Sequence, residues 1–88
     1  MNVEFEEAFT EGFGRLPTEI QVKCRERVRD FGICYAKRQF PKSFRLHKCG
    51  HFLSVSITMN YRIFVRPIPG GIKFSFVGNH DDADRFLR

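Results

Sequence analysis

The stretch FLSVSITMNYRIFVRPIPGGIKFSFVGNH, residues 52–80, predicts three consecutive antiparallel strands. In residues 52–59 apolar side chains alternate with mostly hydroxyl-bearing ones, which is the two-residue period of a strand with one buried face. A similar alternation continues through residues 61–66 and 72–77, after short loops that contain asparagine, proline and glycine. We therefore expect a sheet with one apolar face and one polar face.

The two loops set the expected register, because a slip of one residue turns every side chain of a strand to the other face. A three-residue loop, 58–60, would keep Ile57 opposite Tyr61, and Asn60 is its residue most tolerant of positive φ. These pairings fix the relation between the first two strands.

The second loop is expected to contain four residues, 67–70, so that Arg66 pairs with Gly71 and Ile63 lies beside Phe74. We prefer it to a loop of five residues, because the longer loop would mix the apolar and polar faces. The third strand then presents its alternate apolar side chains to the same face as the second.

Each face has a distinct chemistry. The apolar face is expected to carry Leu53, Val55, Ile57, Tyr61, Ile63, Val65, Ile72, Phe74 and Phe76. The polar face is expected to carry Ser54, Ser56, Thr58, Arg62, Phe64, Arg66, Lys73 and Ser75. Hydroxyls and cations around one aromatic ring suit a phosphate-bearing ligand, although a solvated sheet face has the same composition.

Length and composition indicate a single folded domain, residues 1–88, with 42% hydrophobic residues. No apolar run is long enough for a membrane span, and the acidic start, Met1–Glu4, does not resemble a signal peptide. Three irregularly spaced cysteines do not form a disulfide framework, so a cytoplasmic location is expected.

The formal net charge of +5 favours a polyanionic partner, either nucleic acid or an acidic protein. Residues 1–14 contain acids and no base, whereas most Lys and Arg residues lie within residues 15–66. The basic surface is therefore expected to come from the middle of the chain.

Two helices are expected before the sheet, preceded by a short edge strand at Val3 and Phe5. Residues 6–13 fit one or two helical turns, and Thr18 would cap a longer helix ending between residues 31 and 37. One stripe of the longer helix is apolar and should cover the sheet: Ile20, Cys24, Val28, Phe31 and Tyr35.

Residues 36–51 form a basic connector in which Phe40 and Phe44 alternate with cations. Basic residues with interleaved aromatics suit nucleic acid. Alternatively, the two Phe side chains anchor a loop to the core and its charges keep it soluble.

Histidines supply the candidate chemistry. His80 follows the third strand, where its imidazole can act as a general acid or base, and Arg62 could neutralise charge on a phosphorane. Alternatively, His80 caps the acidic residues 81–84, which look like the start of a C-terminal helix rather than a Mg²⁺ site. The spacing His47-x-Cys49-x-His51 permits a zinc site but lacks a second ligand pair.

Five segments, in this order, resemble the RelE/ParE/HigB superfamily of small toxins from bacterial toxin–antitoxin modules. They are Leu16-Pro17-x-Glu19-Ile20-Gln21, Phe44-Arg45-Leu46-His47-Lys48, Ser54-Val55-Ser56-Ile57, Tyr61-Arg62-Ile63 and Val77-Gly78-Asn79-His80-Asp81. Together they span nearly the whole chain. The resemblance implies an α+β fold, in which two N-terminal helices pack on one face of a small twisted antiparallel sheet.

For many members the resemblance implies a metal-independent endoribonuclease that cuts mRNA on the ribosome, without a cofactor and under the control of an antitoxin protein. Matching positions imply Arg62 as phosphate clamp and His80 as acid/base residue, with His47 and Lys48 as substrate-binding or secondary catalytic residues. We add further RNA-binding candidates: Arg45, Ser54, Phe64, Arg66 and Lys73.

One departure concerns the aromatic residue that several members carry shortly after the position of His80. Here Asp84 stands near that position, and Phe64 or Phe86 would have to stack on a base instead. Other branches inhibit DNA gyrase, and some members are inactive, so both alternatives stay open.

An antitoxin could inhibit such a toxin in either of two ways. An acidic segment could cover Arg62, Arg66 and Lys73 and bury apolar residues against Phe64. Alternatively, the antitoxin wraps the helical side and leaves the polar face open.

Overall fold

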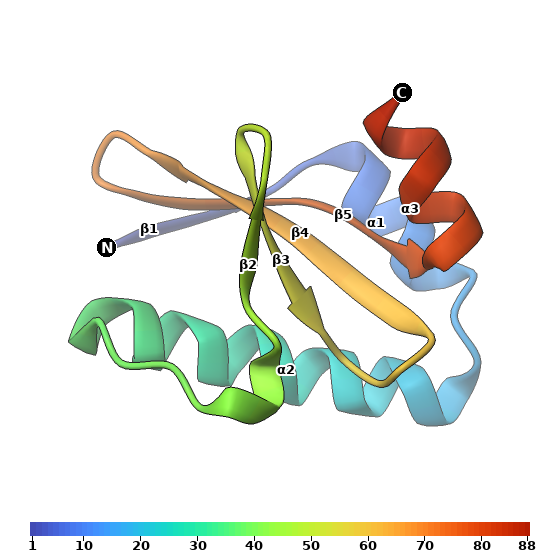
Figure 1. Ribbon diagram of the computed structural model, residues 1–88, viewed down its shortest axis with the longest axis horizontal. Helices are drawn as coiled ribbons and strands as arrows, with labels where there is room; N and C mark the ends of the chain where they lie inside the picture. The colour runs from blue at the N-terminus through green and yellow to red at the C-terminus, as the bar shows by residue number, and fades with distance from the viewer.

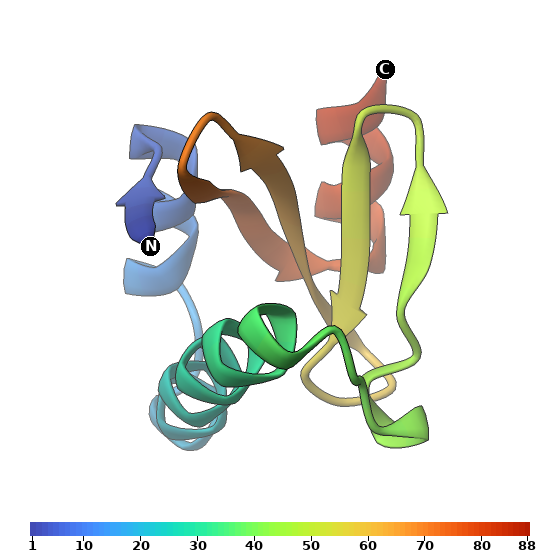
Figure 2. The same ribbon diagram turned by 90° about the vertical axis from the view of Figure 1, so that its left-hand side faces the viewer.

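The computed structural model covers residues 1–88 and shows a five-stranded sheet with helices on both faces (Figure 1). Along the chain the elements are β1 (Asn2–Phe5), α1 (Glu7–Gly14), α2 (Thr18–Lys37), a 3-10 helix (Lys42–Phe44), β2 (His47–Cys49), β3 (Phe52–Ser56), β4 (Tyr61–Ile68), β5 (Gly71–Asn79) and α3 (His80–Leu87). Figures 1 and 2 place α2 below the sheet and α3 above it. None of the helices is both long and apolar enough to span a bilayer.

The strand order is β1-β5-β4-β3-β2. Strands β2 to β5 are antiparallel to their neighbours, as expected, and the α+β class is confirmed. The edge strand β1 differs, because it runs parallel to β5, with Val3 opposite Ile72. The helices α1 and α2 and the rest of the sheet intervene between these two strands, which gives the chain the length that a parallel pairing requires.

The register predicted for β3 and β4 is confirmed. The backbone N–H of Ile57 donates to the carbonyl oxygen of Tyr61 at 2.9 Å, so these residues are opposite one another. The tolerance of Asn60 for positive φ is not used, since no residue of this loop has positive φ. Instead the Asn60 N–H donates to Thr58 Oγ1 at 3.2 Å, which closes the loop through a side chain.

The register predicted for β4 and β5 was wrong. Arg66 pairs with Lys73 rather than Gly71, and the loop contains two residues rather than four. Pro69 and Gly70 occupy the two central positions of the turn, and Gly70 has a φ of 77°. A type II turn needs positive φ at its second central residue, so this Pro-Gly pair favours the shorter connection.

A β-bulge then changes the pairing within β5. Val65 is opposite Phe74, whereas Phe64 is opposite Phe76, so that Ser75 has no partner across the ladder. The extra residue reverses the alternation beyond it. Val77, rather than the predicted Phe76, therefore joins the core.

The long helix α2 covers the core face of the sheet as predicted. Its apolar stripe packs against the core, with Cys24 and Phe31 buried and Ile20, Val28 and Tyr35 partly buried. Thr18 does not cap the helix, because Pro17 is the N-cap residue and no side chain accepts a hydrogen bond there. The helix ends at Lys37, the limit of the predicted range.

Two aromatic rings of the connector between α2 and β2 pack against this core. Phe40 lies 5.4 Å from Phe31, measured between ring centroids, and Phe44 is only 3% exposed. Both rings therefore anchor the connector to the core, and its cations are left on the surface.

Phe74 is the central ring of the core, and its truncation should destabilise the fold. Its centroid lies 5.3, 5.8 and 5.9 Å from those of Phe5, Phe9 and Phe31. We expect Phe74→Ala to cost about 3 to 5 kcal/mol in the free energy of unfolding, measured by urea denaturation. Exposed Met59→Ala is the control, and an unchanged melting temperature for Phe74→Ala would contradict this packing.

The close approach of α1 to β5 gives a second prediction. A Cβ atom at Gly12 would lie 2.2 Å from the carbonyl oxygen of Val77, whereas a Cβ at Gly14 would meet nothing within 4 Å. Gly12→Ala should therefore destabilise the protein by about 1 to 3 kcal/mol through overpacking. Gly14→Ala in the same helix should be neutral or stabilising by up to about 1 kcal/mol, as helix propensity favours alanine. Equal melting temperatures for the two variants would rule out the tight contact.

Candidate functional site

The sheet face opposite the core, here called the α3 face, is divided into three parts along the strands. Its middle is an aromatic cluster formed by Phe52, Phe64, Phe76 and Phe86. The Phe76 and Phe86 centroids lie 4.6 Å apart and the rings are stacked. Phe64 lies beneath them and is 2% exposed, so its ring is not open to stack on a nucleic-acid base.

One end of the α3 face holds cations that already have acidic partners. Arg66 donates to Glu6 Oε1 at 3.3 Å, and Lys73 Nζ lies 3.5 Å from Glu4 Oε1 and 3.9 Å from Glu6 Oε1. These acids come from β1 and the residue after it. The basic patch expected at Arg66 and Lys73 is therefore largely neutralised within the chain.

The other end of the α3 face holds Arg62. Its guanidinium donates to Ser54 Oγ at 2.7 Å, and Ser54 is fully buried. The hydroxyl therefore does not contact solvent or a ligand directly. It fixes a partly exposed cation against the sheet, which is how a clamp for phosphate can be held ready.

His80 begins α3 directly after β5. Its Nε2 lies 2.6 Å from the carbonyl oxygen of Met59 in the β3–β4 loop. A carbonyl oxygen only accepts, so Nε2 carries the hydrogen and Nδ1 is the nitrogen free for proton transfer. His80 does not cap the helix, because Asn79 Oδ1 accepts from the Asp82 N–H at 2.9 Å, but the predicted C-terminal helix is confirmed.

Arg62 and His80 lie at the same end of the sheet. Arg62 is opposite Gly78 in the β4–β5 ladder, and His80 follows two residues later, roughly 7 Å along the chain. A shallow hollow of about 350 Å³ beside His80 is lined by Asn60, Tyr61, Asn79, His80 and Asp81. Arg62 does not line this hollow, because its guanidinium is directed to Ser54 on β3.

His47 lies on the edge strand β2. It is opposite Ser54, the residue that holds Arg62, and directly opposed residues project to the same face. Its Nδ1 lies 3.3 Å from the carbonyl oxygen of Arg45, which leaves Nε2 free. His47 therefore projects to the α3 face from the edge strand, two strands away from Arg62 of β4.

Lys48 and Arg45 lie apart from these residues. Lys48 is opposite Leu53, which packs on the core, so its side chain leaves the sheet on the other face. Arg45 is exposed in the connector and adopts a left-handed conformation with φ of 46°.

The sulfur and imidazole groups do not converge on a metal site. No group of three His, Cys, Asp or Glu side chains is placed to share an ion, and His51 lies in the turn after β2. The three cysteines are free. Burial raises the pKa of Cys24 to about 12, so this thiol stays protonated and acts as a small core residue.

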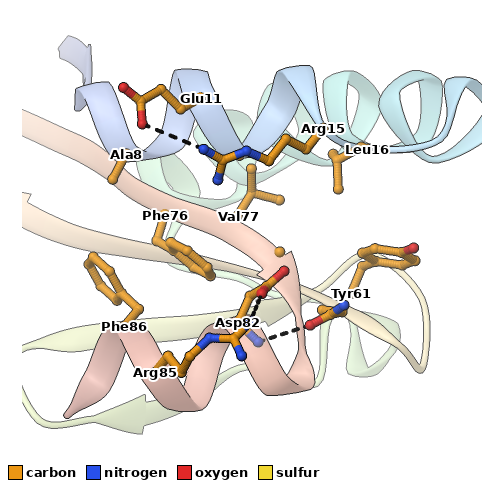
Figure 3. A pocket seen from close by; sticks show the side chains of 13 residues that line it. Ala8, Glu11, Arg15, Leu16, Tyr61, Phe76, Val77, Asp82, Arg85 and Phe86 are labelled. Atoms are coloured by element: carbon orange, nitrogen blue, oxygen red, sulfur yellow. Dashed lines mark hydrogen bonds and ion pairs between the residues drawn. The ribbon is translucent and has the colours of Figure 1, made fainter.

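A cleft of about 470 Å³ lies between α1, the end of β5 and α3 (Figure 3). Its walls carry two ion pairs, Glu11 with Arg15 and Asp82 with Arg85, and its floor includes Phe76. None of the predicted site residues lines it. The charged groups of this cleft are therefore already paired with one another.

Glu4 and Glu6 are the residues that the sequence interpretation missed. They alternate with Val3 and Phe5, and this alternation could have placed both acids on one face. The pairing of β1 with β5, which brings them to Lys73 and Arg66, joins opposite ends of the chain. Local patterning does not encode such a contact.

Solved structures share this fold, although their sequences are distant. A chain of the RelB–RelE antitoxin–toxin complex from Methanococcus jannaschii aligns with a TM-score of 0.73 and 14% identity, covering 97% of this chain and 99% of its own. A chain of the E. coli DinJ–YafQ complex aligns at 0.71 and 10%, covering 92% and 94%. A copper-bound mutant toxin from Helicobacter pylori aligns at 0.70 and 10%, covering 93% and 97%.

These structural neighbours are RelE-like toxins, and the chain has the RelE-like fold. No protein-family model matches the sequence, and no curated protein is significantly similar to it. At such low identities the likeness defines the architecture, and the chemistry has to be argued from the residues of this chain.

The contact between Ser54 and Arg62 can be tested by a double-mutant cycle. We expect Ser54→Ala and Arg62→Ala to be coupled by about 1 kcal/mol in the free energy of unfolding, because each removes the same charge-assisted hydrogen bond. Ser75→Ala is the matched control, since Ser75 is equally buried but donates to the Lys73 carbonyl at 3.5 Å. Additive effects for Ser54 and Arg62 would show that the hydrogen bond does not hold the guanidinium.

Proposed function

We propose that this protein is the toxin of a type II toxin–antitoxin module and cuts mRNA on the ribosome without a metal ion. One observation carries the proposal: Arg62, held by the buried Ser54, lies at the same end of the sheet as His80, whose Nδ1 is free. The RelE-like fold supports it, because the structural neighbours are toxins of such modules.

The proposed reaction uses the substrate's own 2′-hydroxyl as nucleophile. Nδ1 of His80 takes the proton from the 2′-hydroxyl, whose oxygen attacks the adjacent phosphorus. Arg62 stabilises the negative charge of the phosphorane. His47 Nε2, protonated, gives a proton to the 5′-oxygen as the P–O bond breaks, which yields a 2′,3′-cyclic phosphate and a free 5′-hydroxyl.

The remaining candidate residues have more limited roles in this proposal. Ser54 positions Arg62, and Phe64 supports the sheet beneath α3, since both are buried. Arg66 and Lys73 can contact RNA only where phosphate competes with their acidic partners. Phe86 is partly exposed in the aromatic cluster and is the ring proposed to stack on a base.

We also propose a cognate antitoxin and a cytoplasmic location, where ribosomes are found. RelE and YafQ were solved in complexes with the antitoxins RelB and DinJ. On the α3 face Arg62 has no acidic partner in the structure, unlike Arg66 and Lys73. An acidic antitoxin segment that inhibits by covering this face would therefore depend on Arg62 above the other two cations.

Expression in bacteria with mapping of transcript ends tests the reaction. We expect wild-type protein to generate new mRNA ends, His80→Ala to lower cleavage by about 10² to 10⁴, and Arg62→Ala by about 10² to 10³. His51→Ala removes an exposed imidazole outside the site and should cut as wild type.

Three outcomes would contradict the proposal. Growth arrest without new mRNA ends would exclude the nuclease, and a DNA-damage response with continuing translation would identify gyrase as the target. Tight RNA binding without toxicity would indicate an inactive member of the fold.

A further inference from the structure

The connector between α2 and β2 lies in a part of the chain that contains no acid. From Phe31 to His80 the sequence has neither Asp nor Glu. Five cations of this region belong to the connector and its two ends, and are called here the connector cations: Lys37, Arg38, Lys42, Arg45 and Lys48. Figures 1 and 2 show the connector running along α2 from its C-terminal end to the start of β2.

All five connector cations are exposed, and none forms an ion pair. The cations that do pair with acids lie elsewhere: Arg15, Arg29, Arg66, Lys73 and Arg85. The connector therefore holds half of the ten cations without an acidic partner, whereas the α3 face has Arg62. These five cations occur within residues 37–48, and such uncompensated charge raises the local concentration of an anionic partner.

The backbone of the connector adds an independent observation. Only two residues other than glycine have positive φ, and both are connector arginines: Arg38 at 57° and Arg45 at 46°. Each ends a helix, a position where glycine or asparagine avoids a steric cost of about 1 kcal/mol. Arginine at both positions implies that the side chains, rather than the backbone, are what the site requires.

The connector also exposes no large apolar side chain against which a partner peptide could fold. The large exposed apolar side chains of the protein are Met1, Val3, Phe5, Val22, Ile33, Met59 and Leu87, and none lies within the connector. Phe40 and Phe44 face the core. Protein interfaces rely on buried apolar anchors, whereas phosphate contacts need only cations and hydrogen-bond donors.

We infer that the connector cations form a second RNA-contacting surface, which binds the phosphate backbone and is separate from the residues that cut. The inference rests on the proposed function only in taking RNA as the polyanion, and it requires no cleavage. The connector leads directly into β2, which carries His47, so an RNA held on it lies next to the cutting residues. In this inference the connector cations supply affinity for RNA, whereas Arg62, His80 and His47 supply the catalysis.

The test is a binding measurement with a labelled RNA hairpin whose 2′-hydroxyls are methylated, so that it cannot be cut. The connector variant carries Arg38→Asn, Lys42→Gln and Arg45→Asn, because asparagine tolerates the left-handed backbone. The control variant, Arg15→Gln, Arg29→Gln and Arg88→Gln, removes the same number of charges from other surfaces. Both variants lower the formal net charge equally from +5.

We expect the connector variant to bind the hairpin at least about tenfold more weakly at 50 mM salt, and its log–log salt slope to fall by about 2. The affinity of the control variant for the hairpin should stay within about threefold of the wild-type value, because its three arginines lie outside the connector and should not contact the RNA phosphates. The connector variant should melt at or above the wild-type temperature, because asparagine relieves the left-handed backbone at two positions, and the control variant should melt close to it, because no core contact changes.

Three results would overturn the inference: wild-type affinity in the connector variant, equal weakening in both variants, or loss of affinity for the antitoxin alone. The last result would assign the surface to an acidic protein. A wild-type protein that binds RNA through the connector but cuts no mRNA would refute the proposed nuclease and leave this inference standing.

Discussion

The β-bulge at Ser75 is the constraint on which both layers of the molecule depend. A regular strand would send Phe74 and Phe76 to one face, and the other face would lack a large ring. With one extra residue in β5, Phe74 and Val77 enter the core beneath α2, while Phe76 meets Phe86 of α3. A single strand thereby supplies the contacts that hold helices on both faces of the sheet.

The aromatic cluster that results also determines what the α3 face can do. It separates Arg62 from Arg66 and Lys73, so this face does not present one continuous basic surface. Glu4 and Glu6 neutralise one end, and only the other end keeps a cation without an acidic partner beside free imidazole nitrogens. On the α3 face, the cation without an acidic partner is therefore confined to one short segment of the sheet.

Local patterns in the sequence predicted the β3–β4 pairing and the buried stripe of α2, because alternation and helical periodicity report directly on burial. They did not predict the bulge. Residues 72–76 alternate without interruption, so the pattern signals neither the bulge nor the two-residue turn at Pro69 and Gly70, and both shift the register. The candidate residues Arg62 and His80 were found from motif and position, whereas burial of Ser54 and Phe64 followed from α3 folding back, which no local pattern encodes.

The parallel pairing of β1 with β5 has a consequence for how the protein is made. The hairpins β2–β3, β3–β4 and β4–β5 form between neighbours in the chain, but Asn2 must wait for Gly71. Closing so long a loop is entropically costly and slow compared with hairpin formation. During synthesis β1 therefore leaves the ribosome before the other strands but can pair only after β5 has emerged.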